Sequence, residues 1–545
     1  MKFSQGGKRK LSALIFTGLV PFTFVGCDSA SPGVGRADLV FINGAEVTGL
    51  DPVAVSDQIS GRVITSLFEG LMRFNAQGRA EPGVSTEPEV SADKLTYTFH
   101  LRPEAQWTDG KQIVRPVTSR DFLNSWRRFL EPANGADYAS IFFCIKNAEA
   151  FNSPKPASKP IDFSEVGLAA PHDRTFIVTL ANPTPYFRDL VAFMCFCPVS
   201  ITGGPEDNRF HFKPGSIVSN GPFVLVDWKL NDRLRLKKNP HYWDAANVAL
   251  ETVDVLPISN ASTALNLFLT GGADLLLDKG LIPPNLGPRL RQENYFHYKQ
   301  FLGTWFLRFN CDRPPFNDPR VRRAFAMVID KSRIVTAITQ YGENAARSMV
   351  PPGTGDNYQP PEGLKLDLEA ARKLMAEAGF PDGRGFPLVK YLFPNLSIEP
   401  NIAVELQSMW EKGLGVKVAL PKQEYKVYLA TQRTLDFDIC RSSWIGDYND
   451  PNTFLDMFTT GNGNNRTGWG NPDYDASILA AAAEPDPAKR FDIFRKAEEL
   501  LCNQAAAVAP VYHYVGIQFY HPDKLTGVEA NLTDEHPLRV IRMKR

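Results

Sequence analysis

The segment from Phe437 to Pro451 constrains the fold more than any other, because it specifies where a β-strand ends. Residues 437–441 alternate apolar with polar side chains, which is typical of a strand, and turn-forming residues occupy positions 446 and 449–451. Asp447 therefore lies where the strand breaks, close to Trp444. A carboxylate beside an indole ring could hold an ammonium group. The alternative is a solvated Asp that caps a turn.

Two helices with clear boundaries precede this strand. Asp318 can cap the first, and Pro319 suits its first position. The residues expected on its apolar face are Val321, Ala324, Phe325, Val328 and Ile329. The second helix spans 369–378 and ends at Gly379, where a left-handed cap is expected. Helices that alternate with strands in this way predict an α/β lobe.

Length and charge narrow the class of protein. A chain of 545 residues exceeds one typical domain, so two or three domains are expected. With 43% hydrophobic and 22% charged residues, the composition is that of a globular protein. The 60 basic and 60 acidic side chains cancel, so nucleic acid and anionic surfaces are not expected partners.

The N-terminus predicts export. Basic residues 8–10 precede an apolar run, 11–25, which is too short and too broken by Pro21 to be a usual membrane span. The run closes at Cys27 and resembles a bacterial lipoprotein signal, which implies cleavage after residue 26 and a lipid on Cys27. The alternative is ordinary secretion with cleavage nearby. Residues 27–36 would form a flexible tether.

Six further cysteines leave their pairing open. They are Cys144, Cys195, Cys197, Cys311, Cys440 and Cys502. Six cysteines allow 15 pairings, and the sequence does not choose among them. Free buried thiols are an equal alternative, because reduced cysteine packs as a small hydrophobe.

Motifs for catalysis are missing from the sequence. It contains no Gly-x-Ser-x-Gly, no His-Glu-x-x-His and no phosphate-binding loop of the Walker type. The one-residue spacing of Cys195 and Cys197 favours core packing over a zinc site. His513 could act as a base in a cleft, but its place in an alternating run suits a strand equally well. We therefore expect no enzyme, no metal and no cofactor.

Several segments together resemble one family of proteins. Residues 99–110 fit the pattern FxLRxxxxWxDG, and residues 121–126 fit DFxxSW. Residues 444–451 fit Trp-x-x-Asp-Tyr-Asn-x-Pro. These patterns are similar to those of the extracellular solute-binding proteins of family 5, which deliver oligopeptides to ABC importers. The resemblance spans residues 38–544, nearly all of the expected exported chain.

The resemblance implies a fold and its domains. The fold would be α/β, a two-lobed periplasmic-binding-protein fold of type II with an extra subdomain and mixed sheets flanked by helices. Lobe I would comprise residues 37–68, 200–302 and 516–545, with an inserted subdomain at 69–199. Lobe II would occupy 303–515. The ligand would lie between the lobes.

The resemblance also implies a binding site. Asp447 would hold the peptide's free α-amino group, and the strand edge from Arg441 to Gly446 would pair with the peptide main chain. Arg441 and Arg433 would lie near the peptide carboxylate. Four aromatic residues would line the cleft, although each of them alone is better explained by core packing. The full set is Tyr138, Tyr425, Arg433, Arg441, Ser442, Ser443, Trp444, Gly446, Asp447 and Tyr514. The histidine that some relatives place near the carboxylate has no match in residues 395–401.

The expected function is that of a receptor for short peptides. Its partners would be the transmembrane subunits of an ABC importer, and it would not hydrolyse its ligand. We expect a monomer at the periplasmic face of the bacterial cell membrane, anchored through Cys27. The alternatives are another solute on the same fold, such as a metal chelate, a sugar or a cell-wall peptide, and a non-transport interaction protein.

Overall fold

A computed structural model describes residues 35–154, 160–201, 216–396 and 398–544. The predicted export signal and Cys27 lie outside these residues. Residues 37–545 form one compact unit. Within the described ranges, none of the helices combines the length and apolar character needed to span a bilayer.

The largest sheet in the described residues has twelve strands and mixes parallel with antiparallel pairs. Its main order is β10-β11-β12-β1-β13-β20-β14-β19-β16-β17, with β15 on β20 and β18 on β16. Its strands are β1 (Leu39–Ile42), β10 (Phe223–Lys229), β11 (Arg233–Lys238), β12 (Thr252–Leu256), β13 (Leu275–Leu277), β14 (Phe296–Phe309), β15 (Asn344–Ala345), β16 (Val389–Pro394), β17 (Val418–Ala419), β18 (Lys422–Gln423), β19 (Ile439–Ile445) and β20 (Val508–Phe519).

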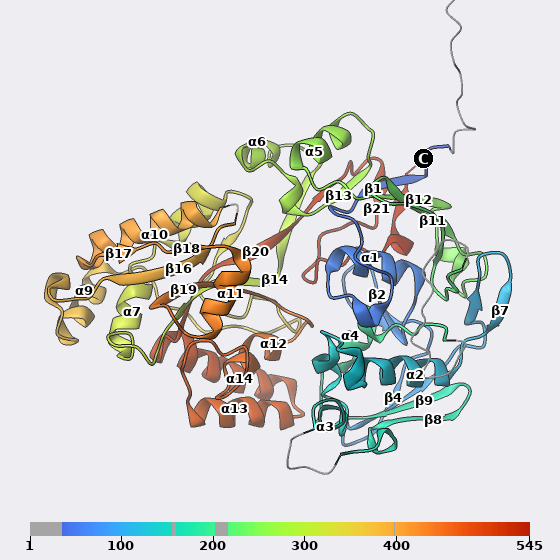
Figure 1. Cartoon of the computed structure of the whole chain (residues 1–545), viewed down its shortest axis with the longest axis horizontal. Coiled ribbons are helices and arrows are strands. Elements are labelled where there is room, and N and C mark those ends of the chain that lie inside the picture. The colour runs from blue at the N-terminus through green and yellow to red at the C-terminus, as the bar shows by residue number, and fades with distance from the viewer. Residues whose placement is uncertain (1–34, 155–159, 202–215, 397, 545) are drawn as a thin grey trace, which may run out of the picture. The chain divides into compact units, whose positions relative to one another are not determined.

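Two long antiparallel strands, β14 and β20, connect the halves of this sheet. The Phe519 end of β20 pairs with β13, beside β1 and β12. The second half of β14 pairs with β19, which in turn pairs in parallel with β16. Figure 1 shows both strands between blue β1 and the orange and yellow helices α7, α9 and α10.

Helices cover the half of the sheet that contains β16 and β19. Asp318 caps α7 (Pro319–Met327), which confirms the predicted start of the helix. The five residues expected on its apolar face are all buried, although Val328 and Ile329 lie just beyond its last residue. The second predicted helix is α9 (Leu368–Glu377), and Gly379 follows it with φ of +97°. The remaining helices after residue 260 are α5 (Ala261–Leu269), α6 (Gly287–Leu290), α8 (Lys331–Arg333), α10 (Glu399–Leu414), α11 (Tyr425–Arg433), α12 (Asn452–Leu455), α13 (Pro472–Ala483) and α14 (Pro487–Glu499).

The first 200 residues add small sheets and helices, whose buried side chains share one core with those of β1, β11 and β12. The strands there are β2 (Met72–Phe74), β3 (Ala80–Pro82), β4 (Glu89–Val90), β5 (Thr96–His100), β6 (Gln106–Thr108), β7 (Ile113–Pro116), β8 (Leu168–His172) and β9 (Thr175–Thr179), with β21 (Leu525–Thr526) and β22 (Arg542–Met543) pairing at the chain's end. The helices are α1 (Gln58–Leu67), α2 (Ser119–Leu130), α3 (Ala148–Asn152) and α4 (Phe187–Ala192).

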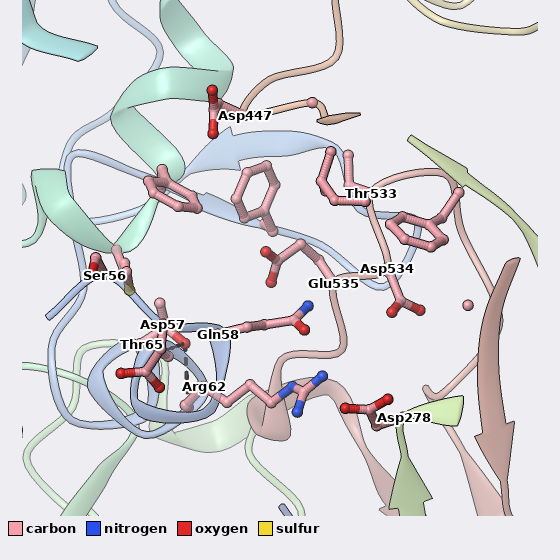
Figure 2. A pocket seen from close by; sticks show the side chains of 18 of the residues that line it. Ser56, Asp57, Gln58, Arg62, Thr65, Asp278, Asp447, Thr533, Asp534 and Glu535 are labelled. Atoms are coloured by element: carbon pink, nitrogen blue, oxygen red, sulfur yellow. Dashed lines mark hydrogen bonds between the residues drawn. The ribbon is translucent and has the colours of Figure 1, made fainter. Parts of the chain in front are cut away.

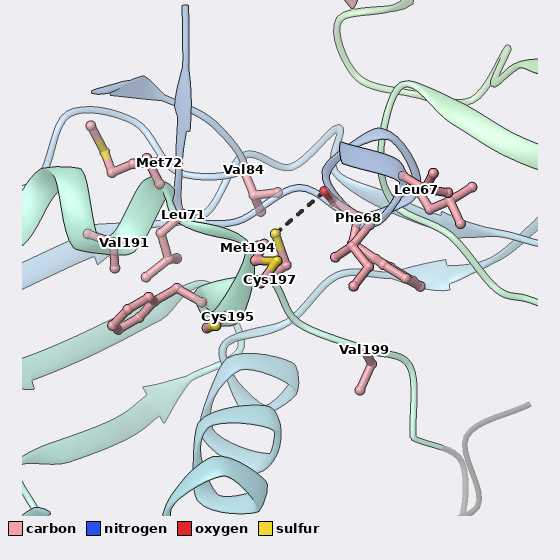
Figure 3. Packing of buried hydrophobic residues seen from close by; sticks show 14 of the residues in the cluster. Leu67, Phe68, Leu71, Met72, Val84, Val191, Met194, Cys195, Cys197 and Val199 are labelled. Carbon is pink, nitrogen blue, oxygen red and sulfur yellow. Dashed lines mark hydrogen bonds between the residues drawn. The ribbon is translucent and has the colours of Figure 1, made fainter. Parts of the chain in front are cut away.

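Cysteines pack inside this core. Figure 3 shows Cys195 and Cys197 among buried apolar side chains, with the Cys197 thiol donating to the carbonyl oxygen of Phe68. All six cysteines of the described residues are free. Burial raises the pKa of Cys195 well above its ordinary value, so the thiol stays protonated and acts as a small apolar side chain.

Candidate functional site

A cavity of about 410 Å³ lies where distant segments of the chain meet. Its walls come from the start of α1, from the turns after β13 and β19, from the second half of β20 and from a loop near the C-terminus (Figure 2). The lining residues are Ser56, Asp57, Gln58, Gly61, Arg62, Thr65, Phe74, Tyr138, Phe193, Met194, Asp278, Lys279, Phe301, Ile445, Gly446, Asp447, Val515, Gly516, Ile517, Thr533, Asp534 and Glu535. The volume is within the range of ligand pockets.

Asp447 reaches this cavity because β19 ends two residues earlier. The Gly446 nitrogen still donates to the carbonyl oxygen of Leu302 on the neighbouring strand, at 2.8 Å. The Asp447 nitrogen instead donates to Thr453 Oγ1 at 3.2 Å, which turns the chain away from the sheet. Within the described residues, the carboxylate of Asp447 has no hydrogen-bond donor and no ion-pair partner. Burial raises its pKa to about 6.

The last residues of β19 have a partner strand on one side only. β14 pairs with β19 from Ile439 to Ile445, whereas β16 pairs only with Ile439 and Cys440. Backbone groups of successive residues point to opposite sides of a strand. Because Gly446 bonds toward β14, the backbone N–H and C=O of Ser443 and Ile445 point away from it. An open strand edge therefore leads to Asp447.

Arg441 already has partners in this structure. Its Nε lies 2.8 Å from Oε1 of Glu399, its Nη1 donates to Ser443 Oγ at 3.0 Å, and its Nη2 donates to the Tyr514 hydroxyl at 3.1 Å. The carbonyl oxygen of Arg441 accepts from Tyr428, which ends the open edge on that side. Arg441, Ser443 and Tyr514 thus form one hydrogen-bonded group beside the cavity rather than part of its lining.

The other candidate residues lie beneath β19, on α11 and in the cavity wall. Ser442 is buried and accepts from Arg308 Nε at 3.0 Å, and Trp444 packs on the core beneath β19. Tyr425 and Arg433, at the two ends of α11, are exposed and do not line the cavity. Tyr138 does line it and stacks edge-on against Phe193. Burial, followed by the Asp447 charge, raises the pKa of Tyr138 to about 12.

Most residues of the cavity wall were not predicted from the sequence. Arg62, Asp278 and Lys279 line it, as do Asp534 and Glu535 near the C-terminus. These residues belong to short loops or to a helix without a functional motif. The pair of successive acids at 534 and 535 was the one local signal that could have drawn attention. Glu399 was not predicted either, although it stands next to Pro400 in residues 395–401, the segment without a matching histidine.

The histidine that could have acted as a base lies in the protein interior. His513 is buried in β20, its Nδ1 lies 2.9 Å from Thr304 Oγ1, and burial lowers its pKa to about 3. It therefore stays neutral within the sheet. In the ranges that the structure describes, no three His, Cys, Asp or Glu residues gather as metal ligands.

Comparisons with known proteins find a matching family model, similar sequences and similar structures. The family model described as bacterial extracellular solute-binding proteins, family 5 Middle, matches residues 79–466. The periplasmic oligopeptide-binding protein OppA of Salmonella typhimurium is 34% identical, with 94% of each chain covered. The Escherichia coli murein tripeptide binding protein MppA has a similar structure, with 32% identity, a TM-score of 0.75, and coverage of 93% of this chain and 98% of that one. Haemophilus influenzae OppA, solved in complex with RPPGFSPFR, is 27% identical with a TM-score of 0.74, over 93% of this chain and 100% of that one.

Proposed function

The chain belongs to family 5 of the bacterial extracellular solute-binding proteins, and from this membership we propose that it captures short peptides by their main chain and free amino terminus. The family is one of two-lobed binding receptors and not of enzymes. Relatives named for oligopeptide binding at about a third identity support peptides as the ligand class.

One observation supports the mode of binding most directly: the open edge of β19 ends inside a cavity, at a carboxylate that has no partner among the described residues. A peptide strand added at Ser443 and Ile445 would form main-chain hydrogen bonds that do not depend on its side chains. Its ammonium group would then meet Asp447. A charge-assisted bond inside a cavity is stronger than a neutral one and sets the register of the strand.

The contacts favour Arg433 as the residue that holds the carboxylate end of the peptide. Arg441 is occupied by Glu399, so a ligand carboxylate there would have to replace an existing buried partner. Within the described residues Arg433 has no ion-pair partner, and it lies close enough to Arg466 for the two charges to repel. A ligand carboxylate near α11 would relieve that repulsion.

The proposal extends to domains and partners. We assign lobe I to residues 37–68, 200–302 and 516–545, its inserted subdomain to 69–199, and lobe II to 303–515. The lobes would close around the peptide and present it, as a monomer, to the transmembrane subunits of an ABC importer. A lipid on Cys27 would hold the receptor at the periplasmic face of the membrane, after removal of residues 1–26.

A double-mutant cycle tests the role of Asp447. Calorimetry would compare wild type and Asp447→Asn with an alanine tripeptide and its N-acetylated form. Removing one member of a buried charge pair costs about 2–5 kcal/mol, so the free peptide should bind the variant roughly 30-fold to several thousand-fold more weakly. The acetylated peptide should bind both proteins poorly and with similar affinity.

The matched control is Asp473→Asn, which removes an exposed acid on the same proposed lobe, outside the cavity. It should bind the free peptide as wild type does. If Asp447→Asn also binds the free peptide within about twofold of wild type, Asp447 is only a turn residue and the proposed recognition of the amino terminus is wrong.

A further inference from the structure

The cavity has more negative charge than one peptide amino terminus can neutralise. Five acids line it, at positions 57, 278, 447, 534 and 535, against two bases, Arg62 and Lys279. Both bases have other contacts. Arg62 donates to Asn43 Oδ1 at 3.3 Å, and Lys279 lies 4.3 Å from the centre of the Tyr514 ring.

Three of the five carboxylates are engaged by the protein itself. Asp57 caps α1 and accepts from the Ser60 nitrogen at 2.7 Å. Asp278 accepts from the Gly280 nitrogen at 2.7 Å, and Asp534 accepts from Gln518 Nε2 at 2.8 Å. Asp57 and Asp278 thus hold the local backbone, and Asp534 holds the Gln518 side chain of β20.

Glu535 differs from those three and resembles Asp447. Within the described residues, no donor reaches its carboxylate and no cation forms an ion pair with it. Figure 2 shows its carboxylate directed into the cavity, which Gln58 also lines. Burial raises the pKa of Glu535 to about 7, although the Arg62 charge opposes that shift. Burying an acid without a partner costs free energy unless a ligand supplies a hydrogen-bond donor or a cation.

We propose that Glu535 is a second cation-binding position and that the receptor selects peptides with a lysine or arginine side chain in their amino-terminal part. The inference rests on the proposed function, because it assigns the first acid, Asp447, to the ammonium of the amino terminus. Both carboxylates line one cavity, so a single ligand would have to supply both cations. A basic side chain near the amino terminus supplies the second one.

The test compares peptides that differ in one charge. Calorimetry at pH 8, where Glu535 is ionised, would measure Lys-Ala-Ala against norleucine-Ala-Ala, and Ala-Lys-Ala against Ala-norleucine-Ala. Norleucine matches the length of the lysine chain without its charge. Wild type should prefer lysine by about tenfold or more at one of the two positions, as expected for a charge-assisted hydrogen bond.

Glu535→Gln keeps the size of the side chain and should reduce this preference to within about twofold. Glu293→Gln is the matched control, an exposed acid outside the cavity that should keep the full preference. Equal binding of lysine and norleucine peptides by wild type overturns the inference without any variant. A lysine preference that survives in Glu535→Gln overturns the assignment to Glu535. If wild type binds neither peptide of a pair, the proposed function itself fails.

Discussion

Arg441 and Glu399 form a buried ion pair, with Nε 2.8 Å from Oε1. Their side chains are 13% and 5% exposed. Trp305 donates its indole N–H to the same carboxylate, at 3.1 Å. A charge in this environment depends on its partner, because water cannot replace a lost ion pair. Glu399 therefore fixes Arg441 against the sheet beside the proposed peptide site.

We expect Glu399→Gln to destabilise the protein, because it leaves the Arg441 cation buried without its counter-ion. The free energy of unfolding should fall by about 3–5 kcal/mol, measured by urea denaturation followed by circular dichroism. The control is Glu362→Gln, which removes an exposed partner of Arg347 and should leave the midpoint unchanged. Equal midpoints for Glu399→Gln and wild type would show that Arg441 does not depend on Glu399.

Local signals in the sequence predicted local structure well. Asp318 and Pro319 predicted the start of α7, and the strand before Asp447 appears as β19. Helix caps, prolines and the alternation of apolar with polar residues depend on positions only a few residues apart, so they can be recognised in a single sequence. The family patterns predicted the fold class, which the comparisons confirm.

The cavity wall could not be predicted in the same way. Thr65 and Glu535 meet there only because the chain's last segment returns beside α1, and no short motif records that approach. The partner of Arg441 is also 42 positions away along the chain. Such contacts arise from the order of strands in the sheet, which single-sequence patterns do not determine.

We expect peptide binding to weaken in acid. The pKa of Asp447 is raised to about 6 by burial, and only its ionised form pairs with an ammonium. The affinity for an alanine tripeptide should be level near pH 7 and fall by about tenfold per pH unit below roughly pH 5.5. Calorimetry from pH 4.5 to 7.5 measures this directly. The affinity of Asp447→Asn should not show this fall in acid. A wild-type affinity that stays constant down to pH 4.5 would contradict the prediction.

The Asp447 carboxylate should lower the stability of the unliganded protein. Its folded pKa lies above the ordinary value of 3.8, so the folded state loses stability as pH rises from about 4 through 6. Asp447→Asn should therefore raise the free energy of unfolding by about 1–3 kcal/mol at pH 8. The gain should narrow toward pH 5. Urea denaturation at pH 8 and at pH 5 measures this difference in stability. A variant that is less stable than wild type at pH 8 would refute the prediction.

The lipid anchor can be tested by one substitution. Cys27→Ser removes the only sulfur that the resemblance to a lipoprotein signal assigns to lipid. Several acyl chains together anchor a protein stably, whereas one chain holds it only marginally, so the variant should leave the membrane fraction almost completely. Fractionation and mass spectrometry of the N-terminal peptide measure both effects. Cys144→Ser is the control, and unchanged partition of Cys27→Ser would exclude the anchor.

Tyr186 and Tyr448 connect the two proposed lobes next to the ligand position. Their rings stack with centroids 3.9 Å apart and planes 6° from parallel, and Asn452 Nδ2 donates to both hydroxyls. Tyr448 directly follows Asp447. A contact of this kind stabilises the arrangement in which Asp447 faces the inserted subdomain.

Tyr186→Ala should therefore shift the receptor toward an open state. Aromatic stacking contributes about 0.5–1.5 kcal/mol, so peptide affinity should fall roughly 2- to 10-fold. Tyr186→Phe keeps the ring, loses only the hydroxyl, and should bind almost as wild type does. Small-angle scattering should show a smaller radius of gyration when peptide saturates wild type, because the proposed lobes, joined by β14 and β20, would close as rigid bodies. At subsaturating peptide, Tyr186→Ala should remain larger than Tyr186→Phe. If the wild-type radius does not change on peptide binding, starting from protein verified to be free of ligand, closure is refuted. If the two variants bind peptide with equal affinity, the ring stack does not contribute to closure.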